Sequence, residues 1–113
     1  MREYKLDKMI GGWFIGNFEP SILKTKDFEI AYKKFKKGKL NDDIHFHKIA
    51  TEYNLIIKGS LRIDNLNKVL TENDIFVFEP GEISDVTFLE DTNIVVVKTP
   101  SVENDKYIKI EKK

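Results

Sequence analysis

Short runs of β-branched and aromatic residues, separated by turn residues, constrain this chain more than any other feature. The clearest run is 93–98 (Asn-Ile-Val-Val-Val-Lys), and 75–78 (Ile-Phe-Val-Phe) is a second, continuously apolar run. Such runs are typical of strands. No long window repeats its apolar residues every 3.6 positions, as an amphipathic helix would. The spacing predicts an all-β protein, either a sandwich or a barrel.

Further strands are expected along the rest of the chain. In 27–37 the apolar residues change from even to odd positions, which predicts a bulge or a change of face near Lys33 and Lys34. The unbroken apolar run at 75–78 predicts a strand that is covered on both sides. The tail beyond Pro100 has Tyr107 and Ile108 among charged residues and is expected to add an edge strand. The other expected strands are 10–16, 53–57, 61–63, 68–70 and 85–89.

Length and charge limit what the chain can be. With 113 residues and 41% hydrophobic content, we expect one domain with a single core. Lys plus Arg and Asp plus Glu are equal at 19 each, so no global field recruits nucleic acid or an anionic membrane. The absence of cysteine excludes disulfides, thiolate metal sites and cysteine nucleophiles. The charged N-terminus and the lack of a long apolar run predict a cytoplasmic protein.

Both histidines of the chain, His45 and His47, lie two residues apart. In an extended segment alternate side chains point to one face, so the two imidazoles would share a small volume. Glu52 opens the next expected strand, and pairing of the two strands would bring its carboxylate back toward the imidazoles. Two histidines and a carboxylate suit Zn, Mn, Fe, Ni or Cu. Without Glu52 and the spacing to Gly59, such a pair is more often two satisfied polar residues in a small cavity than a metal site.

The order His45-x-His47, four residues, Glu52, six residues, Gly59 resembles the first motif of the cupin superfamily, His-x-His-x(3,4)-Glu-x(6)-Gly. The segment 45–52 is especially similar to that of the germins, and 73–84 resembles a degraded second motif. The resemblance implies a small jelly-roll β-barrel, the cupin-like double-stranded β-helix. It covers residues 28–98, with the strand 10–16 and the tail 100–113 packing on this core as parts of one domain, 1–113.

In that family the pocket holds a divalent metal on two histidines, one glutamate and a last histidine. Here Ser84 occupies the position of the last histidine, and Asn73 stands where the second motif begins with glycine, a change that a turn tolerates. The resemblance thus implies an open three-ligand site for Zn, Mn, Fe or Ni, to which Ser84 or Asp85 is a candidate addition. The implied ligands are His45, His47 and Glu52.

Three functions stay open at this point. The first is a metal-dependent cupin acting on a small polar molecule, as in the family's dioxygenases, isomerases and decarboxylases. The second resembles the metal-independent sugar-nucleotide isomerases, in which a His-x-His pair acts as acid and base. Those enzymes usually show Arg-Gly before the histidines, where this chain has Asp-Asp-Ile at 42–44. The third is a non-catalytic cupin whose ligand is contacted by Glu79, Tyr53 or Arg62.

Two surface features complete the sequence-based expectations. If His45 and His47 face inward, Ile44 and Phe46 face outward and need a cover, either the N-terminal strand or a second subunit. This predicts a homodimer. The run 33–37 (Lys-Lys-Phe-Lys-Lys) is interpreted as a solvated strand edge rather than a nucleic-acid surface, because the net charge is zero. The aromatic residues Trp13, Phe14 and Phe18 are assigned to core or interface packing rather than to a ligand pocket.

Overall fold

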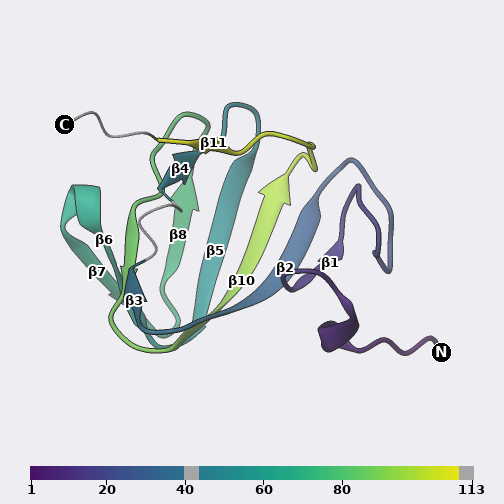
Figure 1. The fold of residues 1–113 in the computed structure, drawn as a ribbon, viewed down its shortest axis with the longest axis horizontal. Coiled ribbons are helices and arrows are strands. Elements are labelled where there is room, and N and C mark those ends of the chain that lie inside the picture. The colour runs from purple at the N-terminus through teal and green to yellow at the C-terminus, as the bar shows by residue number, and fades with distance from the viewer. Residues whose placement is uncertain (40–43, 110–113) are drawn as a thin grey trace.

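Two antiparallel sheets make up most of the computed structural model, which describes residues 1–39 and 44–109 (Figure 1). The larger sheet has the order β1-β2-β10-β5-β8, namely Trp13–Ile15, Glu29–Phe35, Thr92–Thr99, Thr51–Lys58 and Ile75–Phe78. The smaller has the order β3-β9-β6-β7, namely Gly38–Lys39, Val86–Phe88, Ser60–Ile63 and Lys68–Thr71. A two-stranded ribbon pairs β4 (His45–Phe46) with β11 (Tyr107–Ile108), and two 3₁₀ turns lie at η1 (Leu6–Lys8) and η3 (Asp64–Leu66). The predicted all-β class is confirmed.

The core lies between the two sheets. Ile56 of β5 and Leu61 of β6 are fully buried, and the rings of Phe35 and Phe88 stack with centroids 4.3 Å apart, which joins β2 to β9. Each fully buried aliphatic or aromatic side chain stabilises the fold by about 1.5–3 kcal/mol. Along β5, β6 and β10 buried residues alternate with more exposed ones, as the period of two requires. The buried apolar cluster contains Ala31, Ile56, Leu61, Ile63, Phe78, Phe88, Ile94 and Val96.

Strand β2 differs from its prediction. All seven of its residues pair in unbroken register with β10, so the predicted bulge or change of face near Lys33 and Lys34 is wrong. The apolar residues change from even to odd positions because both faces of β2 carry apolar side chains. Ala31, Lys33 and Phe35 face the interior, and Lys34 faces outward. Because β2 is an inner strand between β1 and β10, the solvated-edge interpretation of the lysine run is wrong for Lys33.

Strand β8 is covered on one side only, so the prediction that the run 75–78 is covered on both sides is wrong. It lies at the edge of the larger sheet, with Phe78 inside and with Ile75 and Val77 outside, 70% and 40% exposed. Register pairs these outward residues with those of β5 and continues across β10 to β2. We call this surface the outer apolar face; its residues are Ile30, Tyr32, Tyr53, Leu55, Ile57, Ile75, Val77, Val95 and Val97.

The tail supplies the cover that Phe46 needs. Strand β11 pairs with β4, and the rings of Phe46 and Tyr107 stack with centroids 5.4 Å apart. The predicted edge strand in the tail is therefore confirmed. The cover expected from the N-terminal strand or a second subunit comes instead from the tail, because β11 runs over β4 (Figure 1). The last residues of the tail, 110–113, lie outside the described residues. In the described ranges, no helix is long and apolar enough to cross a membrane.

Candidate metal centre

Three predicted ligands come together at one end of the larger sheet. One donor atom from each of His45, His47 and Glu52 lies within 4.8 Å of the others, and the two imidazole centroids are 5.1 Å apart. The three residues are 9%, 5% and 9% exposed. The chain brings these residues together in a different way from the one expected. The strand with the histidines, β4, pairs with β11 and not with the Glu52 strand, β5. A turn at 48–50 leads the chain from β4 into the larger sheet and brings Glu52 back to the histidines.

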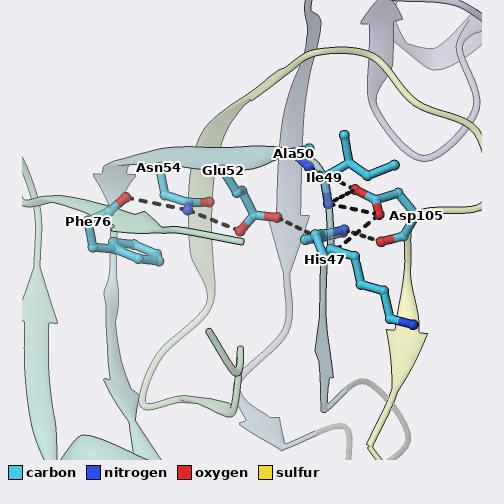
Figure 2. Close-up of polar contacts among 8 residues, drawn as sticks. His47, Ile49, Ala50, Glu52, Asn54, Phe76 and Asp105 are labelled. Atoms are coloured by element: carbon cyan, nitrogen blue, oxygen red, sulfur yellow. Dashed lines mark hydrogen bonds and ion pairs between the residues drawn. The ribbon is translucent and has the colours of Figure 1, made fainter. Parts of the chain in front are cut away.

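Asp105 holds that turn in place (Figure 2). Its carboxylate accepts hydrogen bonds from the backbone N–H groups of Lys48 at 3.0 Å, Ile49 at 3.2 Å and Ala50 at 2.9 Å. Burial raises the pKa of Asp105, but these N–H groups and His47 outweigh burial and hold the pKa below its usual value. Asp105 is therefore an ionised clamp on the turn. Sequence reasoning missed it, since it lies 58 residues from His47 in a tail without a motif.

Asp105 also orients His47. The Nδ1 atom of His47 lies 2.8 Å from the backbone oxygen of Asp105, so Nδ1 carries a proton and donates it to that oxygen. In the neutral ring, Nε2 then presents a lone pair toward Glu52 Oε1, 3.5 Å away (Figure 2). Nε2 is buried and has no hydrogen-bond partner among the described residues. A backbone carbonyl behind one ring nitrogen, with the other nitrogen left for an ion, is typical of metal-binding histidines.

Glu52 faces His47 as a carboxylate. Burial raises its pKa, but the neighbouring His47, the charge of Lys98 and the hydrogen bond from Asn54 outweigh burial, so the pKa lies below its usual value. Asn54 donates from Nδ2 to Glu52 Oε2 at 3.1 Å and approaches the backbone oxygen of Phe76 at 3.5 Å. Asn54 was not predicted as a site residue. Its place two residues after Glu52, on the same strand face, is the signal that would have found it.

The position of the fourth ligand lies beside the triad. Ser84 pairs with His45 through two backbone hydrogen bonds of 2.7 and 3.2 Å, and both residues line one cavity, which is described below. Its side chain is a neutral hydroxyl, a weak substitute for an imidazole. Asp85, the other candidate, is turned away: its carboxylate forms an ion pair with Lys39, which also contacts Asp64. The described residues thus offer three strong ligands and one open side.

Two members of the triad border a cavity of about 230 Å³, whose lining does not include His47. His45 and Glu52 line it together with Lys33, Lys98 and Lys106. Sequence reasoning missed the lysines, because the inner face of β2 was assigned incorrectly and the direction of the Lys98 side chain was not considered. The aromatic residues of the wall are Trp13, Phe35, Phe76, Phe78 and Phe88.

Several sequence-based assignments change as a result. Trp13 lines the cavity, against its assignment to packing alone, although its ring also contacts Phe18 at 6.3 Å. The proposed ligand contacts Glu79, Tyr53 and Arg62 do not line this cavity. Tyr53 belongs to the outer apolar face, and Arg62 forms an ion pair with Asp64.

Comparison with known proteins identifies the fold. No family model and no curated protein sequence matches the chain. Solved structures that resemble it include an uncharacterised double-stranded β-helix protein from Klebsiella pneumoniae (TM-score 0.67, 18% identity, 98% of this chain and 99% of that one). They also include a cupin-2 domain protein from Shewanella frigidimarina (TM-score 0.57, 18% identity, 69% of this chain and 76% of that one) and oxalate decarboxylase from Bacillus subtilis (TM-score 0.60, 21% identity, 74% of this chain and 24% of that one). This chain has the double-stranded β-helix fold of the cupin superfamily.

Proposed function

We propose that this chain binds one divalent metal ion in its barrel through His45, His47 and Glu52, and presents the open side of that ion to a small polar ligand. The observation that carries the proposal is the buried Nε2 atom of His47. Its lone pair faces an ionised carboxylate, and no described donor satisfies it. Two electron-rich atoms that face each other away from water are stabilised by a cation between them. The clamp by Asp105 fixes the imidazole in the tautomer that such a cation needs.

The ligand set also limits the chemistry. Two imidazoles and one carboxylate suit Zn, Mn, Fe or Ni. The oxalate decarboxylase of Bacillus subtilis, which is similar in fold, has Mn(II) centres, so manganese is the first ion to test. A divalent ion supplies a Lewis acid that polarises a ligand oxygen. With Ser84 in place of a fourth strong ligand, the open side faces the cavity.

Metal analysis tests the proposal. We expect about one divalent ion per chain in protein purified without an affinity tag, and loss of most of it in His47→Ala, because a three-ligand site that loses one ligand retains few bonds to the ion. Ser84→Ala is the matched control and is expected to keep the metal content, since the hydroxyl is not one of the three ligands. Ser84→His is expected to tighten binding by completing the set. The measurement is elemental analysis of dialysed protein.

Other results would contradict the metal site. Unchanged metal content in His47→Ala would show that the ion lies elsewhere. Metal-free protein whose thermal midpoint rises with nucleotide sugars would favour the metal-independent isomerase, since ligands of the folded state raise the midpoint. Metal-free protein without that response would favour the non-catalytic binding protein.

We also propose a homodimer, formed through the outer apolar face instead of through Phe46. Four adjacent strands present apolar residues there, and Tyr53 is 44% exposed at the same face. Exposed apolar surfaces that continue over several strands are typical of interfaces. The occupant we choose is a second copy, because the chain has zero net charge and two copies do not repel each other. The cytoplasmic location stays a prediction.

Sedimentation velocity at micromolar concentration is expected to show a dimer. Val77→Lys is expected to shift the protein to monomer, since a charge on the outer apolar face would have to be desolvated in the dimer. Val69→Lys is the control, because Val69 is 56% exposed on β7 of the other sheet. A monomeric wild-type protein at this concentration, or equal effects of the two variants, would exclude this interface.

A further inference from the structure

The cavity beside the triad changes from a polar wall to an apolar one over a short distance. At its polar end, His45 and Glu52 line the wall. Two residues further along β5, roughly 7 Å away, the next inward residue is Asn54. Register places Phe76 of β8 on one side of Asn54 and Val96 of β10 on the other, and both line the cavity. Apolar side chains therefore begin one step beyond the triad.

Asn54 is the polar member of this second layer, and its amide is engaged within the wall. Its Nδ2 atom donates to Glu52 Oε2 at 3.1 Å and approaches the backbone oxygen of Phe76 at 3.5 Å (Figure 2). An amide whose N–H groups are directed to acceptors in the wall offers few donors to a ligand. A ligand that reaches the triad therefore meets apolar surface on this side as soon as it extends past Glu52.

Both sheets contribute to the apolar side of the cavity. Phe76 and Phe78 of β8 have ring centroids 5.7 Å apart and planes at 82°, an edge-to-face pair. The smaller sheet adds Leu61 of β6 with Val86 and Phe88 of β9. A further aromatic ring can pack against the face of one ring and the edge of another. This side of the cavity therefore suits a ring better than it suits hydroxyl groups.

Trp13 adds an aromatic surface at the other edge of the larger sheet. It belongs to β1, whereas Phe76 belongs to β8, the strand at the opposite edge. The ammonium groups of Lys33 and Lys98 lie 5.2 and 5.1 Å from the centre of the Trp13 ring, within the range of a cation–π contact. These contacts hold the indole as a fixed part of the wall. Flat aromatic surfaces on two sides favour a flat ligand.

We propose that the cavity binds a small aromatic molecule with one six-membered ring and an oxygen donor, the ring against Phe76 and Val86 and the oxygen at the triad. The second contact rests on the metal site proposed above; the first does not. An apolar cavity of about 150 Å³ holds benzene, so about 230 Å³ has room for one ring with a short substituent. A sugar of the same size would bury hydroxyl groups against apolar side chains, which costs free energy.

The test is calorimetric titration with three carboxylates that share a six-membered ring: benzoate, the saturated cyclohexanecarboxylate and the hydroxylated glucuronate. Each is titrated into protein loaded with Mn²⁺. We expect benzoate to bind most tightly and glucuronate about tenfold more weakly or worse, because its hydroxyl groups would lose their hydrogen bonds to water. Trp13 is the one tryptophan of the chain, so a change in its emission is expected when benzoate enters the cavity.

Substitutions in the wall locate the bound ring. Val86→Phe fills the cavity and is expected to weaken benzoate binding about tenfold or more and to remove the Trp13 response. Phe76→Leu replaces an aromatic partner by an aliphatic one and is expected to weaken binding about two- to tenfold. Val69→Phe is the matched control, because Val69 is 56% exposed and does not line the cavity. It is expected to bind benzoate as the wild type does.

Phenol, a neutral ring, separates this inference from the proposed function when it is titrated into chelator-treated protein. Phenol binding that Val86→Phe abolishes, in a chain that takes up no metal, would support the ring site while refuting the metal site. Metal uptake by a protein that binds neither benzoate nor phenol at millimolar concentration would refute the ring site alone. Benzoate affinity equal to that of glucuronate or of cyclohexanecarboxylate would overturn the inference, as would equal benzoate affinity in Val86→Phe and Val69→Phe. Thermal midpoints of the ligand-free variants verify folding, and if Val86→Phe does not fold, Phe76→Leu decides.

Discussion

Gly59→Ala is expected to destabilise the protein by about 3 kcal/mol or more, combining a disfavoured backbone conformation with overpacking. Gly59 has a φ of +100°, which side chains other than glycine rarely adopt. A Cβ atom there would lie 2.6 Å from the backbone oxygen of Asp91 and 2.8 Å from the Cα of Thr92. Backbone atoms cannot rotate away as a flexible side chain can. The junction between β5 and β6 would therefore have to move.

Gly81→Ala is a matched control for this substitution. Gly81 has a similar φ of +90°, but a Cβ atom there would meet nothing within 4 Å. It is expected to cost about 1 kcal/mol, the conformational part alone. Chemical denaturation of both variants measures the difference, which isolates the contact with Asp91 and Thr92. Equal losses of stability in the two variants would show that packing does not require the glycine at position 59.

Asp105→Ala is expected to have the second large effect, on both stability and metal affinity. The substitution removes the acceptor of three backbone N–H groups in the turn 48–50. Donors left without partners cost about 1–3 kcal/mol each when buried, and since the N–H of Ala50 is the buried one, we expect a total near 3 kcal/mol. The turn sets the distance between His47 and Glu52. Metal affinity is therefore expected to fall by about 10–100-fold, as for other residues that orient metal ligands.

Two further variants sharpen the Asp105 measurement. Asp105→Asn keeps one acceptor oxygen without the charge and is expected to lie between the wild type and Asp105→Ala. Glu103→Ala removes an exposed carboxylate from the same tail and is expected to change neither quantity. Denaturation of chelator-treated protein gives the stability, and competition with a chromogenic chelator gives the affinity. If Asp105→Ala bound metal as tightly as the wild type, the turn would be held without the clamp.

The sequence predicted those parts of the molecule that depend on neighbours in the chain. The period of two in runs such as 93–98 predicts a strand whatever it packs against. His45, His47 and Glu52 lie close together because a single turn connects their strands. The strands 61–63 and 68–70 were predicted for the same reason; in the structure they pair as the hairpin of β6 and β7, with Asn67 in the left-handed conformation at its turn. Local patterns thus gave the fold class and the triad.

The sequence did not reveal contacts between distant segments. Asp105 reaches the turn across more than fifty residues, and no local pattern distinguishes it from the other acids of the tail. The inward direction of Lys33 depends on its register with β10, since a shift by one residue would exchange it with Lys34. The uncovered side of β8 depends likewise on its place at the sheet edge, which its apolar sequence does not encode.

The position of the clamp has a consequence for how the protein is made. Asp105 follows His47 by 58 residues, so a ribosome that adds roughly 5–20 residues per second synthesises the histidines about 3–12 s before the residue that orients them. During that interval the nascent chain carries the histidines without their fixed tautomer. Tight capture of the proposed ion is therefore expected only after Asp105 has been synthesised and β11 has paired with β4.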